Sequence, residues 1–167
     1  MKESALVIIK PDGIVKDVVG NILIKFSQAK LEIIGMRVLK PTRKFSEEHY
    51  KNIKGQPFFE DVISYFIGKF HRQNKIIAII YYGKGSIAKC RKIAGATNPE
   101  KAKAETIRSA YGRITTKGLY ENVIHVSSDK IEAEREIKLW FNPDEVTKKI
   151  FPIKTKVVKL QKMRVWK

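Results

Sequence analysis

The chain has 167 residues, of which 43% are hydrophobic, so it is long enough for one folded domain and is not disordered by composition. Its 34 Lys and Arg residues outnumber 17 Asp and Glu, and the formal net charge of +17 favours anionic partners such as nucleotides or nucleic acid. A single cysteine excludes a disulfide framework, and no apolar run approaches the roughly 20 residues of a membrane span. We therefore expect a cytoplasmic protein without a membrane span.

The first forty residues predict two strands joined by a helix. Residues 5–9 form a short apolar run that ends at Lys10, and the turn signal Pro-Asp-Gly follows. This pattern is typical of a buried strand. Apolar residues then recur with helical spacing over residues 18–29, and residues 32–39 indicate a second strand.

The middle of the chain predicts helices, a strand and a long loop. Ser46 is expected to cap the start of one helix, and residues 58–66 indicate another. The clearest strand pattern covers residues 75–82, followed by a short helix over 85–93. Residues 100–121 are polar and weakly periodic, which favours a functional loop over a core element.

The last elements complete a recognisable order. Residues 122–126 predict a final strand, and a helix is expected from Asp129 to Trp140. Split β-α-β units of this kind predict an α+β, ferredoxin-like fold: a four-stranded antiparallel sheet with a βαββαβ core, added helices, and helices packed on one face. We expect this domain to cover residues 1–146. A basic C-terminal extension would cover 147–167, which contains eight Lys or Arg and no acid.

His125, on the last predicted strand, is the first candidate for chemistry, although a strand histidine is more often a packed core residue. Other candidates come from separate parts of the chain: Lys10, Tyr50, Phe58, Arg91, Thr97 and Arg108. Each alone has an ordinary structural interpretation. Together, guanidinium groups, a lysine and an aromatic face suit a nucleotide. The chain has no P-loop motif, so phosphoryl transfer would need another device, and a histidine nucleophile is one.

Six separated segments resemble those of nucleoside diphosphate kinases in order and spacing over residues 4–145. They are VIIKPDG (7–13), HYKNIKGQPFF (49–59), GATNP (95–99), TIR (106–108), NVIH (122–125) and EIKLWF (136–141). The resemblance implies an enzyme that passes the γ-phosphate of ATP or another nucleoside triphosphate to a nucleoside diphosphate. The transfer would use a phosphohistidine intermediate in a ping-pong sequence, with low base specificity.

The resemblance also implies a role for each matching residue. His125 would accept the phosphate and Glu136 would orient its imidazole. The nucleotide-binding positions would be Lys10, Tyr50, Phe58, Val62, Arg91, Thr97, Arg108 and Asn122. Within this set, Asn122 and Lys10 would hold the ribose hydroxyl, Phe58 would stack on the base, and Val62 would lie beside it. Mg²⁺ would arrive bound to the nucleotide phosphates and not in a protein cage. A homo-oligomer, tetramer or hexamer, is also implied.

The chain departs from the family pattern at several positions. Ser128 and Asn52 stand where the family commonly has acids, and about four extra residues lie between Arg108 and Asn122. These departures and the basic extension leave two alternatives open. One is a nucleic-acid-binding or scaffolding protein on the same fold, with weak or no kinase activity, that contacts nucleic acid or another polyanion through residues 147–167. The other is a phosphate-binding pseudoenzyme. The extension has two further alternatives: it packs along a neighbouring subunit, or it is disordered.

Overall fold

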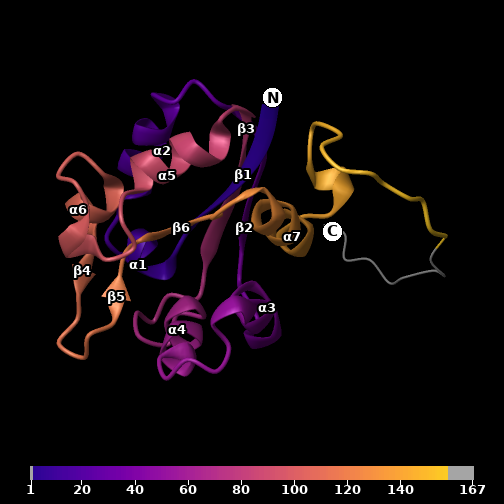
Figure 1. Cartoon of the computed structure of the whole chain (residues 1–167). Coiled ribbons are helices and arrows are strands. Elements are labelled where there is room, and N and C mark those ends of the chain that lie inside the picture. The colour runs from indigo at the N-terminus through magenta and orange to yellow at the C-terminus, as the bar shows by residue number, and fades with distance from the viewer. Residues whose placement is uncertain (1, 158–167) are drawn as a thin grey trace, which may run out of the picture.

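The computed structural model describes residues 2–157 and is built around one four-stranded antiparallel sheet (Figure 1). The strands lie in the order β2-β3-β1-β6. Their bounds are β1 Lys2–Ile9, β2 Glu32–Leu39, β3 Ile76–Lys84 and β6 Ile124–Val126. The predicted α+β, ferredoxin-like sheet is confirmed, because β1 occupies the interior between β3 and the last strand.

Helices cover both faces of this sheet, so the prediction that they pack on one face was wrong. Successive β1 side chains alternate, and Val7 belongs to one buried cluster while Ile8 belongs to the other. Helices α2 (Val19–Ser27) and α5 (Ser86–Ala94) pack on the Val7 face. The opposite face is covered by α7 (Lys130–Trp140) and the end of α4 (Phe59–Phe66), and Figure 1 shows α7 across the sheet from α5.

Two local predictions, a turn at Pro-Asp-Gly and a helix start at Ser46, were wrong. Pro-Asp-Gly does not form a separate turn but begins the short helix α1 (Pro11–Val15), as proline permits at the first helical position. Helix α3 (Arg43–His49) begins before Ser46, and its N-cap is Thr42, whose side chain accepts from the Phe45 N–H at 3.3 Å. Ser46 instead lies inside α3 and donates its hydroxyl to the Thr42 carbonyl at 2.9 Å.

The segment predicted as a loop over 100–121 contains short regular elements. They are the end of η2 (Pro99–Lys101), helix α6 (Ile107–Tyr111) and a hairpin of β4 (Arg113–Ile114) and β5 (Tyr120–Glu121). The remaining short turns of 3₁₀-helix are η1 (Lys51–Ile53) and η3 (Pro143–Glu145). Elements of two to five residues are too short to show a periodic pattern in sequence, which explains the missed assignment.

The chain leaves the domain along the sheet edge. The Thr147 N–H donates to the Ile34 carbonyl of β2 at 2.8 Å, and Lys148 pairs with Glu32 at 3.2 Å. The later half of the predicted extension, residues 158–167, lies outside the described residues. Within residues 2–157, no helix is long and apolar enough to cross a membrane.

Candidate active site

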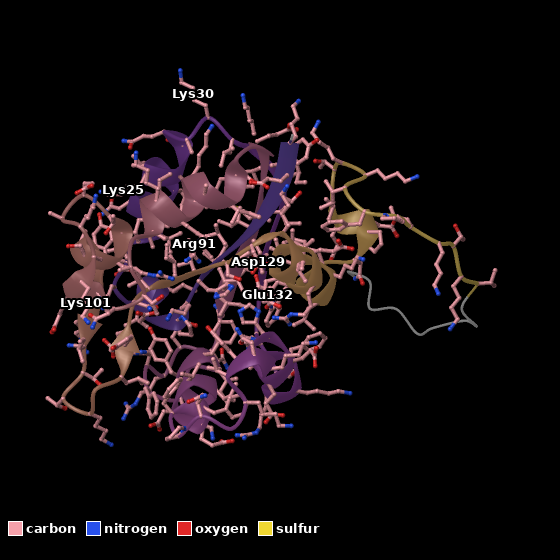
Figure 2. All side chains as sticks on the ribbon, viewed as in Figure 1. Lys25, Lys30, Arg91, Lys101, Asp129 and Glu132 are labelled. Carbon is pink, nitrogen blue, oxygen red and sulfur yellow. The ribbon has the colours of Figure 1, made fainter. Side chains whose placement is uncertain are left out.

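All ten residues singled out from the sequence line one cavity of about 640 Å³. They are Lys10, Tyr50, Phe58, Val62, Arg91, Thr97, Arg108, Asn122, His125 and Glu136. The cavity is bordered by α4, α5, α6, β6, α7 and the β4–β5 hairpin. Figure 2 shows Arg91 of α5 near the centre of the molecule, whereas Lys30 projects outward at the top of the view. Residues scattered over more than a hundred positions therefore share a single concave site.

The imidazole of His125 is held by a carboxylate from the neighbouring helix. His125 pairs with Ile8 of β1, and this register places its side chain on the sheet face that α7 covers. Its Nε2 lies 2.8 Å from Oε1 of Glu136, a residue that is only 3% exposed. The Ser127 hydroxyl donates to Oε2 of the same carboxylate at 2.6 Å. Within residues 2–157 no hydrogen bond engages Nδ1 of His125, and that nitrogen is open to a ligand.

The backbone before His125 is held in an unusual conformation. Val123 has φ +56°, a region that β-branched residues rarely occupy. The buried Asp12 carboxylate accepts from the Val123 N–H at 2.9 Å, and the Lys10 N–H donates to the Val123 carbonyl at 2.9 Å. Gly13 permits this approach, since a Cβ there would lie 3.1 Å from the Val123 oxygen. The start of α1 thus fixes the segment that presents His125.

Three cations converge on the same cavity. Lys10 is 5% exposed, and burial lowers the pKa of its ammonium group to about 8. Arg108 is 8% exposed, and burial together with the charge of Arg91 lowers the pKa of its guanidinium to about 10. Arg91 is exposed at the cavity wall. Lys10 and Arg108 are charged at neutral pH, and together with Arg91 they make the cavity favourable for an anion.

Hydrogen bonds orient the two buried cations. Arg108 donates to the Gly95 carbonyl at 2.8 Å and to the Ile124 carbonyl at 3.1 Å, while its Nε–H has no partner among the described residues. The Lys10 ammonium donates to Oδ1 of Asn122, whose own amide donates to the Thr97 carbonyl at 2.7 Å. These contacts connect α1, α6, β6 and the Gly95–Thr97 turn into one frame around the cavity.

The apolar end of the cavity combines predicted and unpredicted residues. Phe58 is 48% exposed and lines the cavity with Val62. Leu119 and Tyr120 from the β4–β5 hairpin line it as well, and sequence reasoning missed both. The Tyr120 hydroxyl accepts from the Asn98 amide at 3.4 Å. The extra residues before Asn122 were the available sequence signal for these two residues, but an insertion does not show that its hairpin folds over the cavity.

His49, Tyr65 and Ser127 are further residues at the site that carry no role in the sequence prediction. His49 and Tyr65 line the cavity, and the Lys10 ammonium lies 4.5 Å from the centre of the Tyr65 ring. Burial raises the pKa of the Tyr65 and Tyr50 phenols, so both stay protonated. The sequence around His49 and Tyr65 is typical of ordinary core positions, and only the tertiary structure brings these two residues to the cavity.

The cavity offers little to a bare metal ion. Glu136 is the only carboxylate among its described lining residues, and His125 and Ser127 already engage both of its oxygens. The one described cluster with metal-ligand spacing is His49, His125 and Glu136, which offers two nitrogen donors and in which only His49 and Glu136 are buried. Mg²⁺ prefers six oxygen ligands, so this donor set does not fit it.

Known proteins match most of this chain. The family model for nucleoside diphosphate kinase matches residues 3–146. The nucleoside diphosphate kinase of Pyrococcus furiosus is 40% identical over 144 residues, which are 86% of each chain. That of Synechococcus elongatus is 38% identical over 87% of this chain and 91% of its own.

Solved structures give the same result. A nucleoside diphosphate kinase of Halobacterium salinarum in complex with CDP superposes with a TM-score of 0.79 at 29% identity, over 87% of this chain and 91% of its own. The enzyme of Aquifex aeolicus gives 0.78 at 29% identity, over 87% of this chain and 99% of its own. The chain therefore belongs to the nucleoside diphosphate kinase family and is a phosphotransferase.

Proposed function

We propose that His125 is the nucleophile of this kinase and that Nδ1 is the nitrogen that carries the phosphate. The single observation that supports this most strongly is the Nε2–Glu136 hydrogen bond of 2.8 Å, because it places the ring proton on Nε2. The lone pair of Nδ1 then attacks the γ-phosphorus, and the bond to the β-γ bridging oxygen breaks. The nucleoside diphosphate leaves, and a second diphosphate takes the phosphate by the reverse step.

Glu136 and the cations would stabilise the transferring group. The carboxylate of Glu136 stabilises the positive charge that develops on the imidazole, while Ser127 holds its second oxygen. Lys10, Arg91 and Arg108 would bind the phosphate oxygens with Tyr50 and Thr97. Phosphoryl transfer depends mainly on such alignment and charge neutralisation. Magnesium would enter on the phosphates and neutralise part of their charge.

The remaining positions would hold the nucleoside. Asn122 and Lys10, already hydrogen-bonded to each other, are suited to a ribose hydroxyl. Phe58 would stack on the base with Val62 beside it, and we add Leu119 and Tyr120 to this subsite because they line the same space. Stacking reads no hydrogen-bonding edge, so the resulting base discrimination is low.

The proposed chemistry predicts a labelled protein intermediate. Incubation with γ-labelled ATP and magnesium should place label on the protein, stable in alkali and lost in acid, and added GDP should remove it as labelled GTP. A phosphorylated serine would instead survive acid and be lost in alkali, and a phosphorylated carboxylate would be lost in both. Absence of transferable label would contradict both the kinase reading of this chain and the role of His125, and would favour the pseudoenzyme alternative.

The lowered pKa of Lys10 predicts a pH-dependent affinity for nucleotides. The ammonium is charged below about pH 8 and loses its proton above it. Affinity for GDP should therefore fall as pH rises through this value, and calorimetric titration between about pH 7 and pH 9.5 would measure it. Lys10→Met has a side chain of similar length without the charge. Its affinity should be lower at neutral pH and flat across the range, and an equal slope in both proteins would exclude Lys10.

We also propose a cytoplasmic homo-oligomer, tetramer or hexamer. Ile33, Met36 and Val38 of the edge strand β2 are between 46% and 63% exposed, which is a large apolar content for a free edge. Light scattering of the intact chain distinguishes these states from a monomer. Residues 1–146 would form the kinase domain in each subunit, and residues 147–167 would extend beyond it.

The basic extension predicts a salt-dependent contact with nucleic acid or another polyanion, supported by its eight cations and lack of acids. The full chain and a chain truncated after Val146 should differ in their affinity for duplex DNA. The logarithm of affinity falls with the logarithm of salt by about 0.9 per phosphate neutralised, so truncation should reduce this slope. Equal slopes would show that the extension does not contact the polyanion, and would favour its packing along a neighbouring subunit.

A further inference from the structure

His49 lies directly behind the proposed nucleophile. It ends helix α3, is 2% exposed, and its ring meets the edge of the His125 ring at a centroid distance of 4.4 Å. The ring of Phe66 stacks on it at 5.5 Å, and that of Tyr50 meets it edge-on at 4.6 Å. Trp140 closes the group from α7. The imidazole is therefore fixed in position, and its protonation can affect the site.

The hydrogen bond from Trp140 determines which His49 nitrogen carries a proton. The Trp140 Nε1–H, which can only donate, lies 3.1 Å from Nδ1 of His49. Nδ1 must then be the acceptor, and the neutral ring carries its proton on Nε2. If His49 were also protonated on Nδ1, that N–H and the Trp140 Nε1–H would point at each other, and the hydrogen bond between them would be lost. Burial, followed by the charges of His125, Arg135 and Lys10, holds the pKa of His49 well below its usual range.

Nδ1 of His49 also lies near the carboxylate that holds the nucleophile. It is 4.0 Å from Oε1 of Glu136, the same oxygen that His125 Nε2 approaches to 2.8 Å. The Arg135 guanidinium is also 4.0 Å from that oxygen and is held by the Glu48 and His49 carbonyls at 2.8 and 2.9 Å. A proton on His49 Nδ1 would create a second donor for an oxygen that His125 needs.

We propose that Trp140 and His49 form a positioning pair, in which the indole N–H keeps His49 Nδ1 unprotonated and so reserves Glu136 Oε1 for His125. Neither residue of the pair takes part in the transfer itself. This inference rests on the proposed roles of His125 and Glu136. The groups that face His49 are His125 from β6, Glu136 and Arg135 from α7, Lys10 after β1, and Tyr50 after α3.

Trp140→Phe tests the pair, because it keeps an aromatic ring and removes the N–H. The rate of protein labelling by γ-labelled ATP is measured in single turnovers from about pH 5 to pH 9. At the alkaline end the variant should label within about threefold of the unmodified protein. The midpoint of the acid-side loss should move up by about one pH unit, because the variant lacks the N–H that opposes a proton on His49 Nδ1, although the ring stays buried. An unchanged midpoint would overturn the inference.

Two further variants separate titration of His49 from a packing effect. His49→Asn retains an acceptor near the Nδ1 position and cannot be protonated, so adding it to Trp140→Phe should abolish the shift. A shift that persists in the double variant would contradict the proposal. Phe66→Leu disturbs the stacked face without touching the Trp140 hydrogen bond. Phe66→Leu should change the labelling rate and leave the midpoint of the acid-side loss unchanged. A midpoint shift equal to that of Trp140→Phe would mean that both variants act through packing, which would contradict the proposal.

A spectroscopic measurement does not depend on catalysis or on folding of the variants. Nitrogen-15 chemical shifts of His49 in the unmodified protein should show a neutral ring with the proton on Nε2, also at pH values below the usual histidine range. A proton on Nδ1, or a charged ring at neutral pH, would overturn the inference. Loss of label in the unmodified protein would instead contradict the proposed function, so the two failures are distinguishable.

Discussion

His125→Ala is expected to abolish the phosphoenzyme and to reduce nucleoside diphosphate kinase activity by at least about 10⁴-fold. The reason is chemical: within the described cavity, His125 offers the one imidazole nitrogen that is both reactive and free of a protein hydrogen bond. Nucleotide binding should change little, because the cations and Phe58 are untouched. Labelling with γ-labelled ATP measures the first effect, and calorimetric titration with ADP measures the second.

His71→Ala is the matched control for this variant. Its imidazole lies 3.5 Å from Glu121 and does not line the cavity. The control protein should therefore become labelled like the unmodified chain. If label persisted in His125→Ala and disappeared in His71→Ala, the nucleophile would be His71 and not His125.

Glu136→Ala is expected to reduce the rate of phosphate transfer by roughly 10²- to 10⁴-fold, the range found when a positioned partner of a catalytic group is removed. The loss has two physical parts. The developing imidazolium loses its counter-charge, and His125 Nε2 loses the hydrogen bond that fixes the tautomer. The fall should appear in kcat at saturating nucleotide and much less in KM, because the groups proposed to bind the phosphates are Lys10, Arg91 and Arg108 and not Glu136.

Glu134→Ala provides a control on the same helix. The Glu134 side chain is 45% exposed and pairs with Lys138, so its loss should leave both kinetic constants near those of the unmodified protein. A fall in transfer rate as large as that of Glu136→Ala would indicate damage to α7. Normal transfer in Glu136→Ala would exclude the carboxylate as the partner of His125.

Much of the fold was predictable because the long elements carry strong local patterns. Residues 75–82 were predicted as a strand, and the structure has β3 over Ile76–Lys84, where a continuous apolar run marks burial on both faces. Where several residues compete for one local role, prediction failed. Ser46 and Thr42 are both good N-cap residues, and the pairing of Thr42 with the Phe45 N–H decided the helix start.

The short elements near the site were not predictable for a different reason. Helix α6 has five residues and the strands of the hairpin have two each, so long-range contacts define them. Glu121, for example, is 4% exposed and receives Arg113 at 2.5 Å and Lys16 at 3.7 Å. No local sequence pattern near position 121 predicts that Arg113 and Lys16 contact Glu121. Leu119 and Tyr120 were missed as cavity residues because this hairpin places them there.

The sequence by itself determined the chemical content of this protein: a family, a fold class, one candidate nucleophile and a set of cations and aromatics for a nucleotide. The fold class follows from residue types and spacing, which are local, whereas the family and the roles of the site residues were implied by the resemblance of six segments. The tertiary structure alone decided the protonation geometry. That Nε2 of His125 is occupied, that Lys10 is buried enough to lower its pKa to about 8, and that Trp140 reaches His49 all depend on distances between separate elements. Burial and hydrogen-bond direction arise only when the chain closes around the site.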